Sequence, residues 1–116
     1  MSDLPLQEPQ LLLLTSLVEA PRHGYGLIAE VAALSGGRVR LRTGSLYGAL
    51  QRLVHDGLIR VEREEIVDGR ARKVYALTEP GAQVVHAETA RLRALVGELE
   101  RRISPPASAK TRSAIA

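Results

Sequence analysis

The sequence contains no cysteine, tryptophan or phenylalanine, and only three tyrosines among its 116 residues. Without cysteine the chain has no disulfide, no thiolate metal site and no thiol nucleophile. The scarcity of aromatic side chains argues against a ligand pocket built from stacked rings. The longest aliphatic run, residues 11–14, is too short to cross a bilayer, and no secretory or transit segment is evident. We therefore expect a cytoplasmic protein with no membrane partner.

What is present suits one small globular domain with an additional element, since 45% of the residues are hydrophobic and 25% are charged. A core of this size favours a binding module over an enzyme with a large cleft. The net charge is only +3, but residues 38–73 hold nine of the sixteen basic side chains and five of the thirteen acidic ones. This basic middle segment favours a nucleic-acid partner.

Apolar residues recur at helical spacing in three segments of the first half, which predicts three helices. These helices cover residues 7–20, 25–34 and about 43–56, and Gly57 can end the third in a left-handed conformation. Their apolar stripes are Leu11, Leu14, Leu17 and Val18; Leu27, Ile28, Val31 and Leu34; and Leu46, Leu50, Leu53 and Val54. Residues 38–42 alternate arginine with valine and leucine, which fits either a short strand or an extended basic connector.

The second half predicts a β-hairpin and a long helix. Two runs rich in valine, isoleucine and tyrosine flank Asp68-Gly69, a strong signal for a hairpin turn. Thr78 can cap a helix that has Pro80 in its first turn and continues to about Ile103. Residues 104–116, rich in proline, serine and alanine, are predicted to be a disordered tail. The predicted organisation is one small domain over 1–78, a single long helix over 79–103 and this tail.

Three helices followed by a hairpin with a basic turn is the order of a winged helix-turn-helix domain, a mainly α fold with a small β-hairpin. Three stretches, HGYG (23–26), TGSLYGALQRLVHDGLI (43–59) and DGRARKVYALTEPG (68–81), resemble the PadR family of bacterial transcriptional regulators in order and spacing. The resemblance covers residues 10–81. The single long helix that follows is similar to the short PadR subfamily, which implies that this helix mediates dimerisation.

The family motifs are matched with a few departures. The usual Gly-Thr-Leu-Tyr is here Gly-Ser-Leu-Tyr at residues 44–47, and the usual Gly-Arg-Pro-Arg-Lys of the wing is Gly-Arg-Ala-Arg-Lys at residues 69–73. Gly48 stands where the family often has proline, and Gly26 where an acidic residue is common. The resemblance also implies repression that is relieved by a small, often aromatic, effector near the dimer interface. With so few aromatic residues, an aliphatic pocket or control by expression level alone are the alternatives.

The third helix carries a polar face opposite its leucine stripe, made of Gly44, Gly48, Gln51, Arg52 and His55. Gln51 and Arg52 are predicted to read bases, because glutamine pairs with adenine and arginine with guanine. Ser45, Tyr47 and the helix N-terminus, which we expect Thr43 to cap, suit phosphate oxygens, and the two glycines allow close approach. The alternative is a solvated helix face.

Basic and aromatic residues elsewhere extend this predicted interface. Arg70, Arg72 and Lys73 can contact phosphates, although charged hairpin tips are also common for solubility. Tyr25 can contact a phosphate at the start of the second helix or pack in the core. The complete set of predicted DNA-binding residues is Tyr25, Thr43, Gly44, Ser45, Tyr47, Gly48, Gln51, Arg52, Gly69, Arg70, Arg72 and Lys73.

An apolar stripe runs along the long C-terminal helix, beyond the expected reach of the winged domain. Such a stripe needs a partner, and a second copy of the chain is the simplest one. The alternative is a helix that folds back over its own domain. The predicted dimerisation residues are Leu11, Leu12, Val85, Leu92, Leu95, Val96, Leu99 and Ile103.

Catalytic and metal-binding functions find no support in the sequence. The three histidines lie on separate predicted elements, the acidic stretch at 62–65 fits a solvated strand edge, and no nucleophile elbow or dinucleotide loop occurs. We expect no enzyme activity, no cofactor and no metal. The sequence therefore predicts a transcriptional repressor that binds a palindromic operator as a homodimer, with release by a small effector left open. The alternative is a winged-helix module that binds protein.

Overall fold

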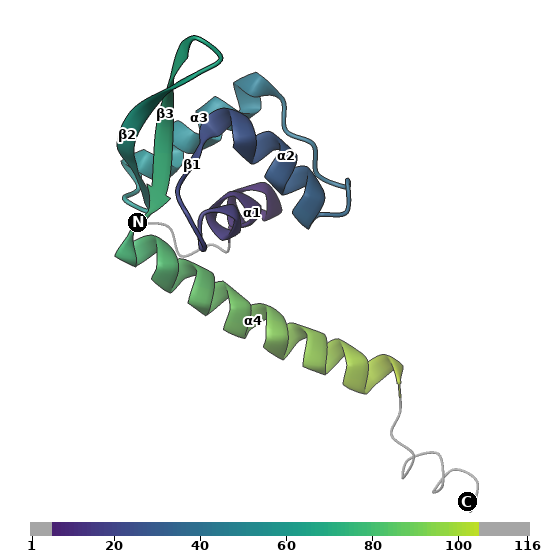
Figure 1. The fold of residues 1–116 in the computed structure, drawn as a ribbon. Helices are drawn as coiled ribbons and strands as arrows, with labels where there is room; N and C mark the ends of the chain where they lie inside the picture. The colour runs from purple at the N-terminus through teal and green to yellow at the C-terminus, as the bar shows by residue number, and fades with distance from the viewer. Residues whose placement is uncertain (1–5, 105–116) are drawn as a thin grey trace, which may run out of the picture. The chain divides into compact units, whose positions relative to one another are not determined.

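Figure 1 shows the fold in a computed structural model, which describes residues 6–104. The elements follow in the order α1 (Glu8–Ser16), β1 (Arg22–His23), α2 (Gly24–Leu34), α3 (Thr43–His55), β2 (Ile59–Val67), β3 (Arg70–Leu77) and α4 (Glu79–Ile103). The chain divides into two compact units, Met1–His86 and Ala87–Ala116, so the beginning of α4 belongs to the unit that holds the other elements. The predicted disordered tail lies outside the described residues apart from Ser104.

Helix α1 ends earlier than its apolar spacing predicts. The hydroxyls of Thr15 and Ser16 donate to carbonyl oxygens four residues back, at 2.7 and 2.8 Å. The backbone N–H groups of Leu17 and Val18 bond to carbonyl oxygens three residues back, as in the tighter turn of a 3₁₀-helix. The chain therefore leaves the helix after Ser16. The prediction that Val18 belongs to the buried stripe is wrong, since its side chain is 53% exposed, and Leu13 is buried instead.

Helices α2 and α3 bury the stripes that their spacing predicts, except at their ends. Leu27 and Val31 of α2 and the three leucines of α3 are fully or almost fully buried, whereas Leu34 and Val54 are exposed, contrary to prediction. Gly57 ends α3 with a φ of 77°, as predicted. The buried residues that join these helices to α1 and the sheet are Leu13, Leu14, Leu17, Leu27, Val31, Leu46, Leu50, Leu53, Ile59 and Tyr75.

A three-stranded antiparallel sheet in the order β1-β3-β2 completes this core. The predicted hairpin between β2 and β3 is confirmed, with Asp68 and Gly69 both at positive φ (52° and 77°), as a two-residue hairpin turn requires. We call this hairpin the wing. Strand β1 is not among the predicted elements, because two residues carry no periodic pattern. Residues 38–42 form no strand, which settles the open question in favour of a connector.

The start of α4 is fixed by Thr78 and Gly81. The Thr78 hydroxyl accepts a hydrogen bond from the Gly81 backbone N–H at 3.1 Å, which confirms the predicted cap, and donates to the Gly57 carbonyl at 2.6 Å. A Cβ on Gly81 would lie 2.0 Å from the Leu58 carbonyl oxygen, so only glycine fits there. The mainly α fold with a small sheet and a long C-terminal helix is the predicted winged helix-turn-helix arrangement.

Candidate nucleic-acid interface

The outer face of α3 (Gly44, Gly48, Gln51, Arg52 and His55) is exposed, while the leucine stripe on the opposite side is buried. Apart from the chain neighbours and the backbone of the helix itself, no heavy atom of the described residues lies within 4 Å of the position that a Cβ would take on Gly44 or Gly48. Packing within the domain therefore does not require these glycines. Because glycine has no side chain, a partner could approach the helix backbone closely at both positions. Gly48, Gln51, Arg52 and His55 together line an open hollow on this face.

The N-terminus of α3 has no side-chain cap. The prediction that Thr43 caps this helix is wrong: Thr43 is its first helical residue, and the cap position is held by Arg42 in an extended conformation. The first backbone N–H groups of a helix lack intrahelical acceptors and carry the positive end of the helix dipole. Arg42 and the exposed Ser45 add a cation and a hydroxyl, so this helix end suits an anion such as a phosphate.

Tyr47 is held in place by the start of α2. A Cβ on Gly24 would lie 3.0 Å from Cε1 and 3.1 Å from the hydroxyl of Tyr47, so Gly24 makes room for the ring. Burial, and to a smaller extent the proximity of Tyr47, raises the pKa of Tyr75 above its ordinary value. Tyr47 is 36% exposed, so one part of its ring lies at the edge of the outer face while another part packs against the start of α2.

At the start of α2, His23 and Arg22 both make contacts within the domain. His23 Nδ1 accepts the Gly26 N–H at 3.2 Å and so caps the helix. Arg22 is also engaged, because its Nε donates to the Ser16 carbonyl at 2.8 Å and its guanidinium lies 3.7 Å from Glu30. Tyr25, in contrast, is 60% exposed, so the alternative that it packs in the core is wrong.

The wing presents its basic residues in two different ways. Arg70 and Lys73 are exposed, and neither forms an ion pair within residues 6–104. Arg72 is half-buried, and its guanidinium carbon lies 4.9 Å from the centroid of the Tyr25 ring. Gly69 supplies the turn itself. The wing therefore offers two free cations beside its tip and one that is already in contact with α2.

Several arginines outside this set are neutralised by carboxylates. Arg38 makes two hydrogen bonds to Glu8, at 2.8 and 2.5 Å, and these bonds hold the pKa of Glu8 below its ordinary value. Arg63 donates hydrogen bonds to Glu65 and Glu62 on β2, and its hydrogen bond to Glu65 is the main reason that the pKa of Arg63 is raised. Arg38 therefore ties the connector to α1, and the acidic stretch of β2 lies on a solvated strand surface.

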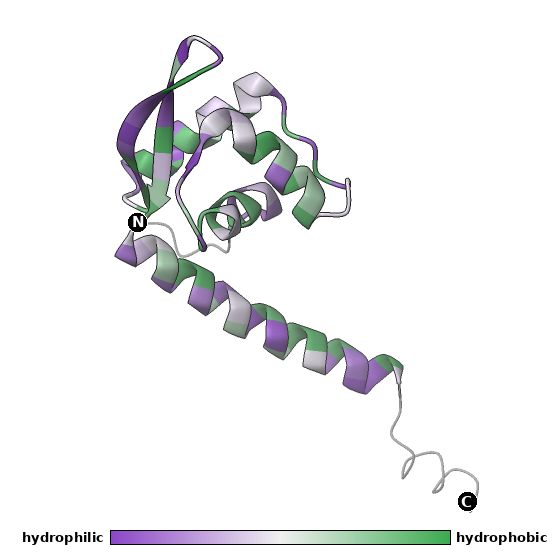
Figure 2. Cartoon of the chain, in the orientation of Figure 1, coloured by the Kyte–Doolittle hydropathy of each residue, from purple (hydrophilic) through white to green (hydrophobic). Residues whose placement is uncertain are grey.

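Helix α4 carries the predicted apolar stripe, visible in Figure 2 as green bands that alternate with purple polar ones. Its side chains are 36–75% exposed at Leu92, Leu95, Val96, Leu99 and Ile103. Val85, Leu12 and the neighbouring Val84 instead pack half-buried against the core of the winged domain. Leu11 is also half-buried. The exposed part of the stripe therefore begins at Leu92.

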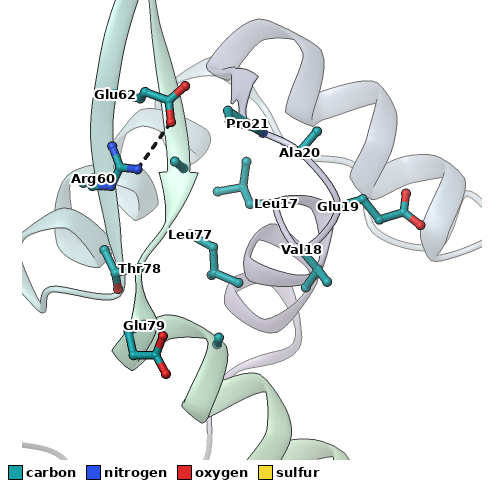
Figure 3. A pocket seen from close by; sticks show the side chains of 12 residues that line it. Leu17, Val18, Glu19, Ala20, Pro21, Arg60, Glu62, Leu77, Thr78 and Glu79 are labelled. Atoms are coloured by element: carbon teal, nitrogen blue, oxygen red, sulfur yellow. Dashed lines mark hydrogen bonds and ion pairs between the residues drawn. The ribbon is translucent and has the colours of Figure 1, made fainter.

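A second hollow, of about 340 Å³, lies at the base of the wing (Figure 3). Leu17 and Leu77 contribute apolar surface to it, and an ion pair of 3.3 Å between Arg60 and Glu62 borders it. The residues that follow α1 meet the end of β3 here, a tertiary contact that no sequence motif indicates. None of the predicted site residues lines this hollow.

Among residues 6–104, no three histidine or carboxylate side chains lie close enough together to hold a metal ion.

The exposed helix face beside a basic hairpin defines a winged-helix domain of the kind that binds nucleic acid. The sequence matches the Transcriptional regulator PadR-like family over residues 13–87. The chain belongs to this family. The family consists of transcription regulators rather than enzymes. No helix within the described part of the chain is both long enough and apolar enough to span a membrane.

Two curated relatives match the chain. An uncharacterised protein in transposon TN4556 of Streptomyces fradiae is 37% identical over 92 residues, which are 79% of this chain and 25% of the relative. Transcriptional regulator Rv3488 of Mycobacterium tuberculosis is 36% identical over 81 residues, 70% of this chain and 62% of the relative. The chain thus spans less than two thirds of the length of either relative.

Solved structures of PadR proteins share the fold. A PadR family transcription regulator from Clostridium difficile has a TM-score of 0.68 at 20% identity, covering 83% of this chain and 97% of that one. Bacillus subtilis PadR in complex with operator DNA has a TM-score of 0.64 at 23% identity, covering 72% of this chain and 47% of that one. At these identities the likeness establishes the fold.

Proposed function

We propose that this chain is a sequence-specific DNA-binding repressor that acts as a homodimer on a palindromic operator. The observation that carries the proposal is the outer face of α3, which is exposed, free of carboxylates and kept low by Gly44 and Gly48. A helix of this kind enters the major groove in winged helix-turn-helix proteins. The Bacillus subtilis relative, solved with operator DNA, supports the same use of the fold.

Base recognition falls to Gln51 and Arg52 in this proposal. Both are exposed on the outer face, and Arg52 forms no ion pair within the described residues, so its guanidinium is free for the two acceptors of a guanine. Thr43, Ser45, Tyr47 and the uncapped N-terminus of α3 fix the register on phosphates. Arg70 and Lys73, beside the Gly69 turn, add phosphate contacts from the wing.

Dimerisation falls to α4. The exposed side chains from Leu92 to Ile103 form an apolar stripe that a second copy of the same helix can cover. We place DNA binding in residues 1–78 and dimerisation in residues 79–103, with Leu11, Leu12 and Val85 at the edge of the interface. A two-fold dimer would set two copies of α3 against two half-sites one or more helical turns apart, which is why we expect a palindromic operator.

A gel-shift titration against the upstream region of its own operon tests this function. We expect binding that survives competitor DNA and weakens steeply with salt. Arg52→Ala should weaken specific binding more than non-specific binding, whereas Arg70→Ala should weaken both and lower the salt slope by about 1 for each bound protomer. Arg102→Ala is the matched control, because Arg102 is exposed, is paired with Glu98 at 2.8 Å, and belongs neither to the proposed DNA-contacting residues nor to the apolar stripe of α4.

Two outcomes would contradict the proposal. An absence of binding at micromolar protein would favour the alternative, a winged-helix module that binds protein. Equal weakening of all DNA sequences by Arg52→Ala would remove this residue from base recognition while leaving DNA binding itself in place.

A further inference from the structure

The wing is attached to the rest of the domain along only part of its length. Strand β1 pairs with β3 at Arg22↔Tyr75 and His23↔Val74, and closer to the turn β3 pairs with β2 alone, up to Val67↔Arg70. A two-stranded ribbon is only marginally stable by itself. A contact beyond β1 is therefore needed if the ribbon is to keep one orientation toward α3.

Tyr25 and Arg72 make such a contact. Tyr25 lies two residues after His23, and Arg72 lies two residues before Val74. The pair therefore continues the register in which β1 and β3 are aligned. The backbone pairing has stopped there because α2 begins at Gly24. The guanidinium carbon of Arg72 lies 4.9 Å from the centroid of the Tyr25 ring, within the range of a cation–π interaction.

The surroundings of the two side chains fit a contact inside the protein. Arg72 is half-buried, and its buried Nε has no hydrogen-bond partner within the described residues, so the ring of Tyr25 is the contact that the structure gives this guanidinium. Arg72 forms no ion pair in residues 6–104, in contrast to Arg63 on the neighbouring strand. Tyr25 remains largely exposed. Its ring therefore contributes to wing contacts rather than to the core.

We propose that Tyr25 and Arg72 form a latch that holds the wing against α2 and sets its orientation before DNA arrives. Arg72 is then a positioning residue that acts through Tyr25, while Arg70 and Lys73 supply the phosphate contacts of the wing. This changes the role that the sequence predicts for Arg72 and Tyr25, both of which it places among direct DNA contacts. The consequence for DNA affinity rests on the proposed function, whereas the latch itself is a property of the free protein.

Hydrogen exchange of the wing amides in the free full-length protein tests the latch. Tyr25→Leu removes the ring and Arg72→Met removes the cation, so each should speed exchange at residues 64–72, and the double variant should exchange no faster than either single one. Tyr25→Phe keeps the ring and should exchange like the original protein. Lys73→Met is the matched control, because it removes a cation from the adjacent residue without touching Tyr25.

DNA titrations of the same variants test the functional consequence. Tyr25→Leu and Arg72→Met should each weaken binding roughly two- to fivefold, the size expected for one exposed cation–π contact, and the double variant should match the singles. Arg72→Met should leave the salt slope unchanged, whereas Lys73→Met should lower it by about 0.9 for each half-site.

The latch is overturned if Tyr25→Leu leaves wing exchange unchanged. The positioning role is overturned if the effects of Tyr25→Leu and Arg72→Met on affinity simply add and Arg72→Met lowers the salt slope like Lys73→Met, because Arg72 would then neutralise a phosphate directly. If the original protein itself did not bind DNA, the proposed function would fail. Hydrogen exchange would still show whether the latch exists in the free protein.

Discussion

The glycines of this chain differ in what surrounds them. A Cβ on Gly81 would meet the Leu58 carbonyl oxygen at 2.0 Å, a contact that only a backbone shift could relieve. Gly44, Gly48 and Gly97 lie in helices, and within the described residues no atom beyond their chain neighbours and the backbone of their own helix comes within 4 Å of the added Cβ. Packing therefore requires the first glycine, whereas the other three reduce helix stability without any gain in packing.

Gly81→Ala should destabilise the protein by about 1–3 kcal/mol, the usual cost of overpacking, because α4 would have to move away from Leu58. Urea unfolding followed by circular dichroism measures the change. Gly97→Ala is the matched control on the same helix and should raise stability by up to about 1 kcal/mol. Equal behaviour of the two variants would show that the close approach at Gly81 does not determine stability.

Single-residue predictions succeed where one pattern decides the environment. The positive φ of Gly57 and the Thr78 cap follow from local chemistry and are confirmed. Val18 is misjudged because helical phase holds only while the helix continues. Tyr25 stays ambiguous in the sequence, since its exposure depends on how α2 and β3 meet, and the contact with Arg72 has no local signal.

Helix α3 combines a well-packed inner side with an outer face that favours contact over helix stability. Leu46, Leu50 and Leu53 anchor it, while Gly48 lies on the exposed side. The absence of a capping side chain at its N-terminus weakens the helix further but leaves its N–H groups available. Both features make sense for a helix whose outer face approaches a large anionic partner.

Gly48→Ala separates these two requirements. We expect the free energy of unfolding to rise by up to about 1 kcal/mol, because alanine has the higher helix propensity and nothing in the described structure blocks its methyl group. If Gly48 serves close approach to DNA, affinity should fall at the same time. Thermal unfolding and DNA titration of one preparation measure both. Unchanged affinity together with higher stability would show that close approach is not the reason for this glycine.

At the level of elements, long periodic segments and strong turn signals were predictable. The presence of the three helices, the Asp68-Gly69 hairpin and the end of α4 at Ile103 agree with the structure, whereas the end of α1 does not. Strand β1 was not predictable, since two residues form a strand only because β3 offers partners beside them. The early end of α1 arises from side-chain hydroxyls that bond its own carbonyl groups, a competition that apolar spacing does not record.

For the whole molecule, the sequence contains enough to assign the family and the fold, because the family motifs coincide with the turns and helix starts that build the winged domain. The positions where DNA and a second copy would bind remain predictions. Release by a small effector also stays a prediction. The hollow bordered by Arg60 and Glu62 could not have been foreseen, because residues far apart in the sequence form it.

The proposed dimer predicts a clear effect of charges in the α4 stripe. Leu95→Glu combined with Leu99→Glu should give a monomer, because two carboxylates per chain would have to be buried where the helices meet. Light scattering across a concentration series measures the mass. Glu100→Gln, at an exposed position outside the stripe, is the control and should remain dimeric. A dimer that persists in the double variant would exclude this stripe as the interface.

Selection of binding sites from a random DNA library is the most direct test of the central claim, that the outer face of α3 reads base sequence. The full-length chain should enrich one motif with two-fold related halves. Arg52→Ala should lose the base preference at one position in each half while keeping the rest of the motif. A library that shows no enrichment at micromolar protein, or an enriched motif that Arg52→Ala and a Gln51→Ala variant both leave unchanged, would contradict this account.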